Sequence, residues 1–232
     1  MWKWRGLTLL GKIQIVKTFV IPRFMSKASL IPVSDDLIKE INKLIYNFIW
    51  HGNDKIKRTA LIYDIEDGGL KTLDIESMIS AQRIMVLKKY FDDNESSWKV
   101  ILDEFLQGVG GKFILFCNFD TRKLPIHILI FYRECLEAWS KLVSSTLNTY
   151  EEIVNLIIWN NKNIAVQKAS VFEHHLFSAG VVKIGDLLSD TGKFFEGAKV
   201  SEANLSTMDY FKLMSIVDAI PNNWRLVIKH NS

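Results

Sequence analysis

The sequence has little cysteine, little proline and no long uninterrupted apolar run. Its two cysteines, Cys117 and Cys135, are too few for a disulfide framework or a cysteine-rich zinc module, and they predict an intracellular protein, cytoplasmic or nuclear. Apolar stretches such as 128–132 are far shorter than the ~20 residues that cross a bilayer, so no membrane partner is expected. With 48% hydrophobic and 24% charged residues over 232 positions, the chain can bury a core, which excludes a disordered or fibrous protein.

Motifs for small-molecule chemistry are also missing. The glycine-rich stretch 108–111 is followed by Lys112, but Phe113 stands where a phosphate loop needs a hydroxyl. The five histidines are scattered, neither cysteine lies in a C-x-x-C, and no G-x-S-x-G elbow occurs. The sequence therefore predicts no small-molecule substrate, and no metal or cofactor held by this chain.

The string Tyr90–Asp93 reads as Y-x-D-D, the pattern of reverse-transcriptase active sites in which paired aspartates bind two metal ions. A catalytic hairpin needs apolar strands on both sides of the aspartates. Here a helical pattern precedes the string, and the polar residues 94–97 follow it. We interpret the string as a helix end with acidic surface residues, and we expect no enzymatic activity from this chain alone.

Positive charge is concentrated in the first quarter of the chain. Residues 1–58 contain eleven basic and four acidic side chains, and residues 1–34 contain six basic side chains and no acidic one. A polyanion approaching this end would meet an unopposed positive field. From charge alone, a second interpretation stays open, in which the lysines only form the solvated faces of amphipathic helices.

Residues 8–30 are apolar on nearly every side, which is typical of a helix that packs on more than one face. Pro22 should kink or divide this helix, because proline lacks an amide hydrogen and clashes with the preceding turn. At about 100° per residue, four basic residues fall in one stripe if the kink leaves the helical phase unchanged. These are Arg5, Lys12, Arg23 and Lys27.

Two further helices have clear starts. Ser34 is expected to cap an amphipathic helix that Gly52 ends, and Asp74 to cap one that runs to about Tyr90. The polar stretch 92–97 predicts a domain boundary, with a basic helical domain at 1–92 and a second helical region at 93–232.

The second region also reads as helical. Helices are expected at 98–106, from Pro125 to about 147, at 207–219 and at 221–228. Short β pairs can form at 164–167 and 181–184, but no run of alternating strands occurs. The sequence therefore predicts a mainly α fold.

Several motifs occur together in an informative order. They are W-x-x-R-x-L-T-L-x-G-K-I-x-I-V-K-x-x-V-I-P at 2–22, I-P at 31–32, I-N-K-L-I-Y-N-F-I-W-H-G at 41–52, K-I-K-R at 55–58 and G-G-L at 68–70. This order resembles the region directly after the polymerase palm in LINE-type (non-LTR) retrotransposon reverse transcriptases. The later W-N-N at 159–161 and A-I-P-x-x-W at 219–224 are similar to the post-thumb region of the same elements, although less distinctive.

The resemblance implies that residues 1 to about 90 are a helical thumb, which holds the template and primer duplex behind the active site. The palm, with its magnesium-binding aspartates, would belong to a missing part of a longer polymerase. An RNA/DNA duplex is then the expected partner, and lysine and arginine contacts to its phosphates would position it without reading its sequence. The candidate contact residues are Arg5, Lys12, Lys17, Arg23, Lys27, Lys55, Lys57 and Arg58.

The alternative is a helical protein–protein interaction module with no nucleic-acid role. The long apolar face of residues 37–49 could dock a partner helix. The sequence does not determine the oligomeric state. Trp50, at the end of this face, could stack on a base or pack in the core.

Overall fold

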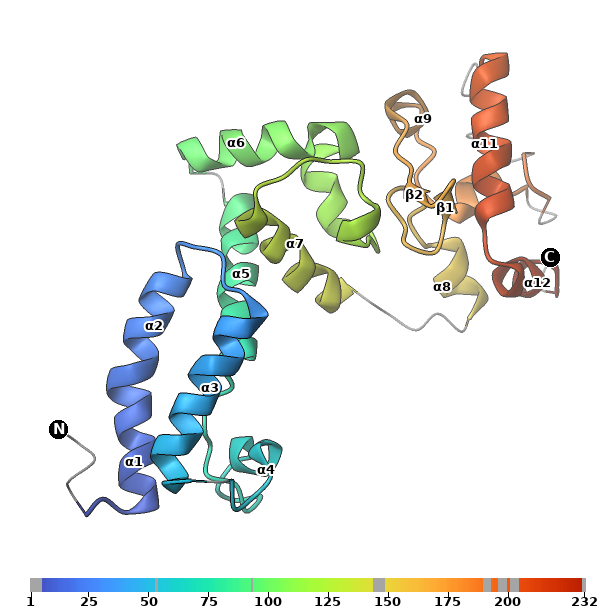
Figure 1. The fold of residues 1–232 in the computed structure, drawn as a ribbon. Helices are drawn as coiled ribbons and strands as arrows, with labels where there is room; N and C mark the ends of the chain where they lie inside the picture. The colour runs from blue at the N-terminus through green and yellow to red at the C-terminus, as the bar shows by residue number, and fades with distance from the viewer. Residues whose placement is uncertain are drawn as a thin grey trace. The chain divides into compact units, whose positions relative to one another are not determined.

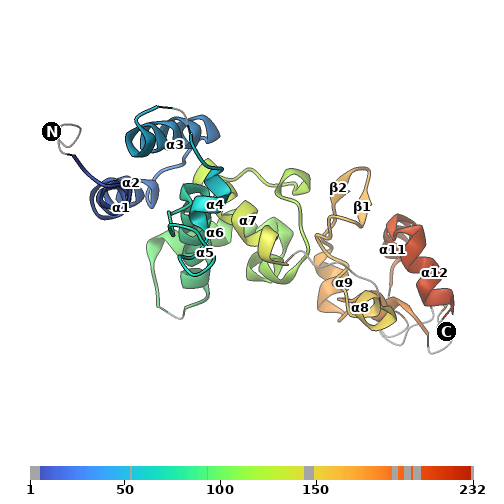
Figure 2. The same ribbon diagram turned by 90° about the horizontal axis from the view of Figure 1, so that it is seen from below.

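The computed structural model describes residues 6–52, 54–92, 94–143, 149–189, 193–195, 200 and 205–230. These residues are mainly helical, with one two-stranded sheet, as the sequence predicts (Figure 1 and Figure 2). The chain divides into two compact units, residues 1–87 (unit 1) and 88–232 (unit 2). Their boundary falls five residues before the predicted one. None of the described helices is both long and apolar enough to cross a membrane.

Unit 1 begins with a continuous helical rod. Its three segments are α1 (Leu9–Ile15), the π-helical turn η2 (Val16–Val20) and α2 (Ile21–Ala28). Pro22 does not divide the rod, because the turn before it widens so that the N–H of Ile21 bonds to the carbonyl of Val16. Such i→i+5 turns absorb one extra residue inside a helix. The rod therefore continues past the proline, but its helical phase changes there.

The next helix, α3 (Asp35–Trp50), returns antiparallel to the rod (Figure 1). Its predicted cap is confirmed, since the Ser34 hydroxyl accepts a hydrogen bond from the N–H of Leu37 at 3.3 Å. His51 ends the helix in a left-handed conformation (φ 54°), one residue before the predicted Gly52, and its N–H bonds to Asn47 O at 2.9 Å.

A short helix, α4 (Arg58–Ile62), and a loop lead to the long helix α5 (Ile75–Phe91). The predicted cap Asp74 accepts a hydrogen bond from the N–H of Ser77 at 3.0 Å. Arg83 lies buried in the middle of α5 and donates to Ala28 O at 2.6 Å and Ile31 O at 2.8 Å. Its guanidinium thus satisfies carbonyls at and beyond the C-terminal end of α2, where helices lack internal donors and favour cations.

Unit 2 combines short helices with tight turns. Its helices are α6 (Ser97–Leu106), α7 (Ile130–Val143), α8 (Tyr150–Val154), α9 (His174–Ser178), α11 (Thr207–Ala219) and α12 (Asn222–His230), and its 3₁₀ turns are η3 (Gln107–Val109), η4 (Gly111–Phe116), η5 (Thr121–Lys123) and η6 (Ile184–Leu187). One hydrophobic cluster surrounds the fully buried Trp159, whose indole N–H donates to Val181 O at 2.7 Å.

Two expectations for unit 2 need correction. The helix predicted to begin at Pro125 begins instead at Ile130, and residues 124–129 before it are non-helical and alternate in burial from Leu124 onward. A β pair does form at 164–167, where β1 (Ala165–Val166) pairs with β2 (Ala169–Ser170), but 181–184 contains no strand. A two-residue turn joins β1 to β2, and Lys183 instead forms an isolated bridge with Ile157.

Candidate nucleic-acid interface

The eight predicted phosphate contacts are placed in different environments. Arg5 lies outside the described residues, and Lys12 is buried. Lys17 is half-buried on η2. The remaining five are exposed, in two groups: Arg23 and Lys27 on α2, and Lys55, Lys57 and Arg58 on the connection after α3 and at the start of α4.

Lys12 is a structural residue. It is 9% exposed, and its ammonium donates to the carbonyl of Ile49, near the end of α3, at 2.9 Å. A helix C-terminus is a favourable place for a cation, because its last carbonyls have no internal donors. Lys12 therefore joins the rod to α3 and does not present its charge to a phosphate.

The π-helical turn separates Lys12 from the other two basic residues of its predicted stripe. The buried apolar positions along the rod are Ile13, Val16, Ile21, Met25 and Ala28. The steps are three or four residues except across the π-helical turn, where the step is five. Because this turn shifts the phase by one residue, the side of the rod that buries Lys12 is no longer the side that carries the cations beyond it.

Arg23 and Lys27 occupy the outer face of α2. They lie one helical turn apart, and both point away from the side that buries Ile21 and Met25. Neither side chain has an ion-pair partner in the part of the chain that the structure describes. The whole rod contains no acidic residue, so these two charges are not opposed along their own helix.

The second group is partly neutralised by its surroundings. Arg58 donates to the carboxylate of Asp54 at 2.8 Å, and its guanidinium stacks over the ring of Tyr46, 4.4 Å from the centroid. Burial raises the pKa of Tyr46, so this ring stays neutral under the cation. Within this group, Lys55 and Lys57 are the exposed cations for which the described residues offer no ion-pair partner.

The structure does not bring the two groups into one patch. Figure 1 shows α2 toward the start of α3 and α4 near the other end of α3. A helix of 16 residues is about 24 Å long, and the two groups lie toward its opposite ends. The α2 face and the α3–α4 connection are therefore separate surfaces.

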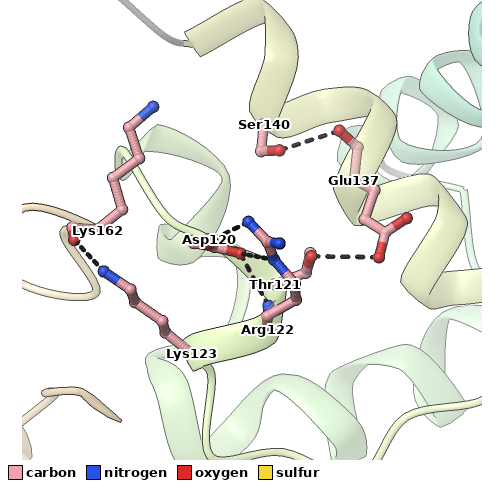
Figure 3. Close-up of polar contacts among 7 residues, drawn as sticks. All are labelled: Asp120, Thr121, Arg122, Lys123, Glu137, Ser140 and Lys162. Atoms are coloured by element: carbon pink, nitrogen blue, oxygen red, sulfur yellow. Dashed lines mark hydrogen bonds and ion pairs between the residues drawn. The ribbon is translucent and has the colours of Figure 1, made fainter. Parts of the chain in front are cut away.

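Several basic side chains of unit 2 are bound by other groups of the protein. Figure 3 shows Arg122 folded back on Asp120, with two guanidinium hydrogen bonds of 3.2 Å, and Lys123 donating to Lys162 O at 2.7 Å. The hydrogen bond from Arg122 lowers the pKa of Asp120, which keeps that carboxylate charged. Thr121, between them, donates to Glu137 at 3.3 Å.

The Y-x-D-D string is not arranged as a polymerase site. Tyr90 is fully buried in α5 and donates its hydroxyl hydrogen to Asp103, while Lys112 lies 4.9 Å from the centroid of its ring. Burial raises the pKa of Tyr90. Asp92 follows the end of the helix, and Asp93 lies outside the described residues. The described residues contain no group of three side chains suited to a metal ion.

Neither cysteine is placed for nucleophilic chemistry. Both are buried and unbridged, and burial raises the pKa of the Cys117 thiol to about 12. A reactive cysteine needs the opposite shift, toward the thiolate. Trp50, considered as a base-stacking residue, packs against the core of unit 1 with its side chain half-buried.

Sequence reasoning missed two features of unit 1. Nothing in the local pattern distinguishes Arg83 from a surface arginine on a helix, because its acceptors lie 55 and 52 residues earlier. For the loop at 63–72, the sequence indicates a turn at the glycine pair but not the hydrogen bonds that close the loop. No protein-family model matches this chain, and a search of curated proteins finds no match either.

Proposed function

We propose that this chain is a non-catalytic region of a LINE-type reverse transcriptase that holds a nucleic-acid duplex by its phosphates during target-primed DNA synthesis. The observation that carries the proposal is the acid-free rod, which directs Arg23 and Lys27 outward from the core. The family in this proposal comes from the resemblance of the ordered motifs at residues 2–70.

The reduced set of contacts gives the proposal a magnitude. Each phosphate that a protein neutralises on duplex DNA contributes about −0.9 to the slope of log affinity against log salt concentration. Arg23 and Lys27, with Lys17 as a third cation, therefore predict a slope of about −2 to −3. Between about 50 and 200 mM salt, affinity should fall about 10- to 40-fold.

The test is anisotropy of a labelled RNA/DNA hybrid with the full chain at both salt concentrations. The double variant Arg23→Gln/Lys27→Gln should make the slope shallower by about 2, because two phosphate contacts are lost. The matched control is Lys39→Gln/Lys43→Gln, which removes the same charge from exposed positions of α3. Absent binding, salt-insensitive binding, or an equal change in both double variants would contradict the proposal.

A protein-interaction module remains the second candidate. Its motivating face is largely used inside unit 1, since Ile45 and Ile49 are buried, but Leu37 and Leu44 stay exposed on α3. Light scattering after size exclusion separates the two candidates. A monomer at all concentrations favours the first, and a dimer that Leu44→Ser abolishes favours the second.

A further inference from the structure

Residues 63–72, which follow α4, form a tightly closed loop that we call the glycine loop. Leu61 O accepts hydrogen bonds from the N–H groups of Leu70 at 3.1 Å and Thr72 at 2.9 Å, so the two ends of the loop are held together. Inside it, Lys71 N–H bonds to Tyr63 O at 2.9 Å and Gly69 N–H bonds to Asp64 O at 2.8 Å. The backbone is thus fixed by its own hydrogen bonds.

Two glycines make this closure possible. Gly68 has φ 78°, a left-handed conformation that other residues adopt at a cost. At Gly69, a Cβ atom would lie 2.0 Å from the carbonyl oxygen of Tyr63, which no side chain permits. The closed shape of the loop therefore depends on both glycines, and it holds the other side chains of the loop in a defined arrangement.

The glycine loop exposes large apolar side chains to solvent. Tyr63 is 60% exposed and Ile65 is 69% exposed, and Ile62 at the end of α4 is partly exposed beside them. Single exposed apolar residues are ordinary on protein surfaces. Three within four consecutive residues, on a backbone held in one conformation, are typical of a contact surface.

The charge around these side chains is negative. Asp64, Glu66 and Asp67 lie in the loop against one cation, Lys71, which pairs with Asp64 at 2.9 Å. The net charge of the loop is −2, whereas the connection before α4 carries the exposed Lys55 and Lys57. A phosphate backbone is repelled by the loop, and a cationic partner is attracted to it.

We propose that the glycine loop is a docking site for a basic, apolar segment of a partner protein. Tyr63 and Ile65 would be covered by apolar side chains of that segment, and Glu66 and Asp67 would pair with its lysines or arginines at the rim. This site shares no residue with the cationic α2 face, so this proposal does not depend on the nucleic-acid proposal.

The experiment uses two synthetic amphipathic helical peptides as probes, one with leucine and lysine and one with leucine and glutamate in the same positions. Each is titrated into the full ¹⁵N-labelled chain at low salt. The lysine peptide should bind with amide shifts concentrated at 61–72, and the glutamate peptide should bind at least about tenfold more weakly, because its charge has the wrong sign. The RNA/DNA hybrid should leave the same amides unshifted.

Variants of the glycine loop test which of its side chains contribute to peptide binding. Tyr63→Ser/Ile65→Ser should weaken the lysine peptide about tenfold or more, because it removes the apolar anchors while leaving the backbone hydrogen bonds intact. The matched control is Met208→Ser/Phe211→Ser on α11, which removes two side chains of similar exposure. Glu66→Gln/Asp67→Asn should weaken binding about threefold and reduce its salt dependence.

Circular dichroism and thermal melting confirm that each variant is folded before titration. The proposal is overturned by equal binding of both peptides, by shifts centred on α11, or by an equal loss of affinity in the control pair. Shifts of the loop amides on addition of the hybrid would overturn it as well, since they would show the loop to be part of a nucleic-acid surface.

Discussion

The two units use their charges in different ways. Unit 1 contains 13 basic and 9 acidic residues, a net charge of +4, and unit 2 contains 16 and 17, a net charge of −1. In unit 1, Arg23 and Lys27 point outward with no acidic residue on their rod. In unit 2, Arg122 and Lys212 are bound by carboxylates within the same unit. The number of basic residues thus says less about binding than the number that the fold leaves unpaired.

The largest expected effect compares a buried arginine of unit 1 with an exposed one of unit 2. Arg83→Met should lower the free energy of unfolding of unit 1 by about 3 kcal/mol, because the carbonyls of Ala28 and Ile31 lose charged donors. Arg122→Met should leave the urea midpoint of unit 2 unchanged, because that side chain is 85% exposed. The measurement is urea unfolding followed by residue-resolved NMR. Equal changes in the free energy of unfolding for the two variants would contradict the prediction.

Substitution of two glycines compares a Cβ that would clash with backbone atoms with a Cβ that would clash with a side chain. Gly69→Ala should destabilise unit 1 by about 2–3 kcal/mol, because its Cβ meets a carbonyl oxygen that is held by a hydrogen bond. Gly110→Ala should cost unit 2 about 1–2 kcal/mol, because its Cβ meets the ring of Phe172, which can shift, and because φ is 93°. Thermal melts of both variants test this order, and a larger cost for Gly110→Ala would reverse it.

Alkaline pH should weaken unit 2 through Cys117. Its pKa is raised from 9.0 to about 12 in the folded chain, so above pH 9 the unfolded state releases a proton that the folded state keeps. Stability that is present below pH 9 is then lost as the pH rises, by about 1 kcal/mol between pH 8 and pH 10.

Cys117→Ala should remove this part of the pH dependence. The measurement is chemical denaturation of both proteins at pH 8, 9 and 10, taken as a difference because Tyr90 also has a raised pKa in the same unit. Parallel pH profiles for the two proteins would contradict the assignment to Cys117.

The smallest expected effect distinguishes the buried Lys12 of unit 1 from its exposed lysines. Lys12→Met should cost about 1 kcal/mol of stability, because one hydrogen bond from an ammonium to Ile49 O is lost while the apolar stem is kept. The salt dependence of hybrid binding should not change, since the ammonium of Lys12 is bonded to Ile49 O inside unit 1. A shallower salt slope in Lys12→Met would show instead that this lysine contacts phosphate.

Local signals predicted most of the helices. Ser34 and Asp74 cap their helices as expected, because their side chains bond amides only three residues away. The helix at 207–219 has the predicted bounds. The start of α7 could not be predicted from Pro125, because proline fits a first helical turn and an extended segment equally well.

The candidate site was less predictable than the fold. Helical spacing placed Lys12, Arg23 and Lys27 in one stripe, and the π-helical turn breaks that stripe between Lys12 and Arg23. Whether a turn widens before a proline depends on how the helix packs against its neighbours, which spacing along one helix does not contain. The same limit applies to Arg58, whose neighbour Tyr46 lies on a different helix.

The amino-acid sequence by itself determined the mainly helical class, the caps of the long helices and the acid-free character of the first 34 residues, because each depends on composition or on neighbours within one turn. Only the tertiary structure decided which cations remain available. Lys12 bonds to a carbonyl 37 residues away, and Arg83 to carbonyls more than 50 residues away. A charged side chain becomes buried when it contacts residues that are distant in the sequence, so its exposure is a property of the folded chain.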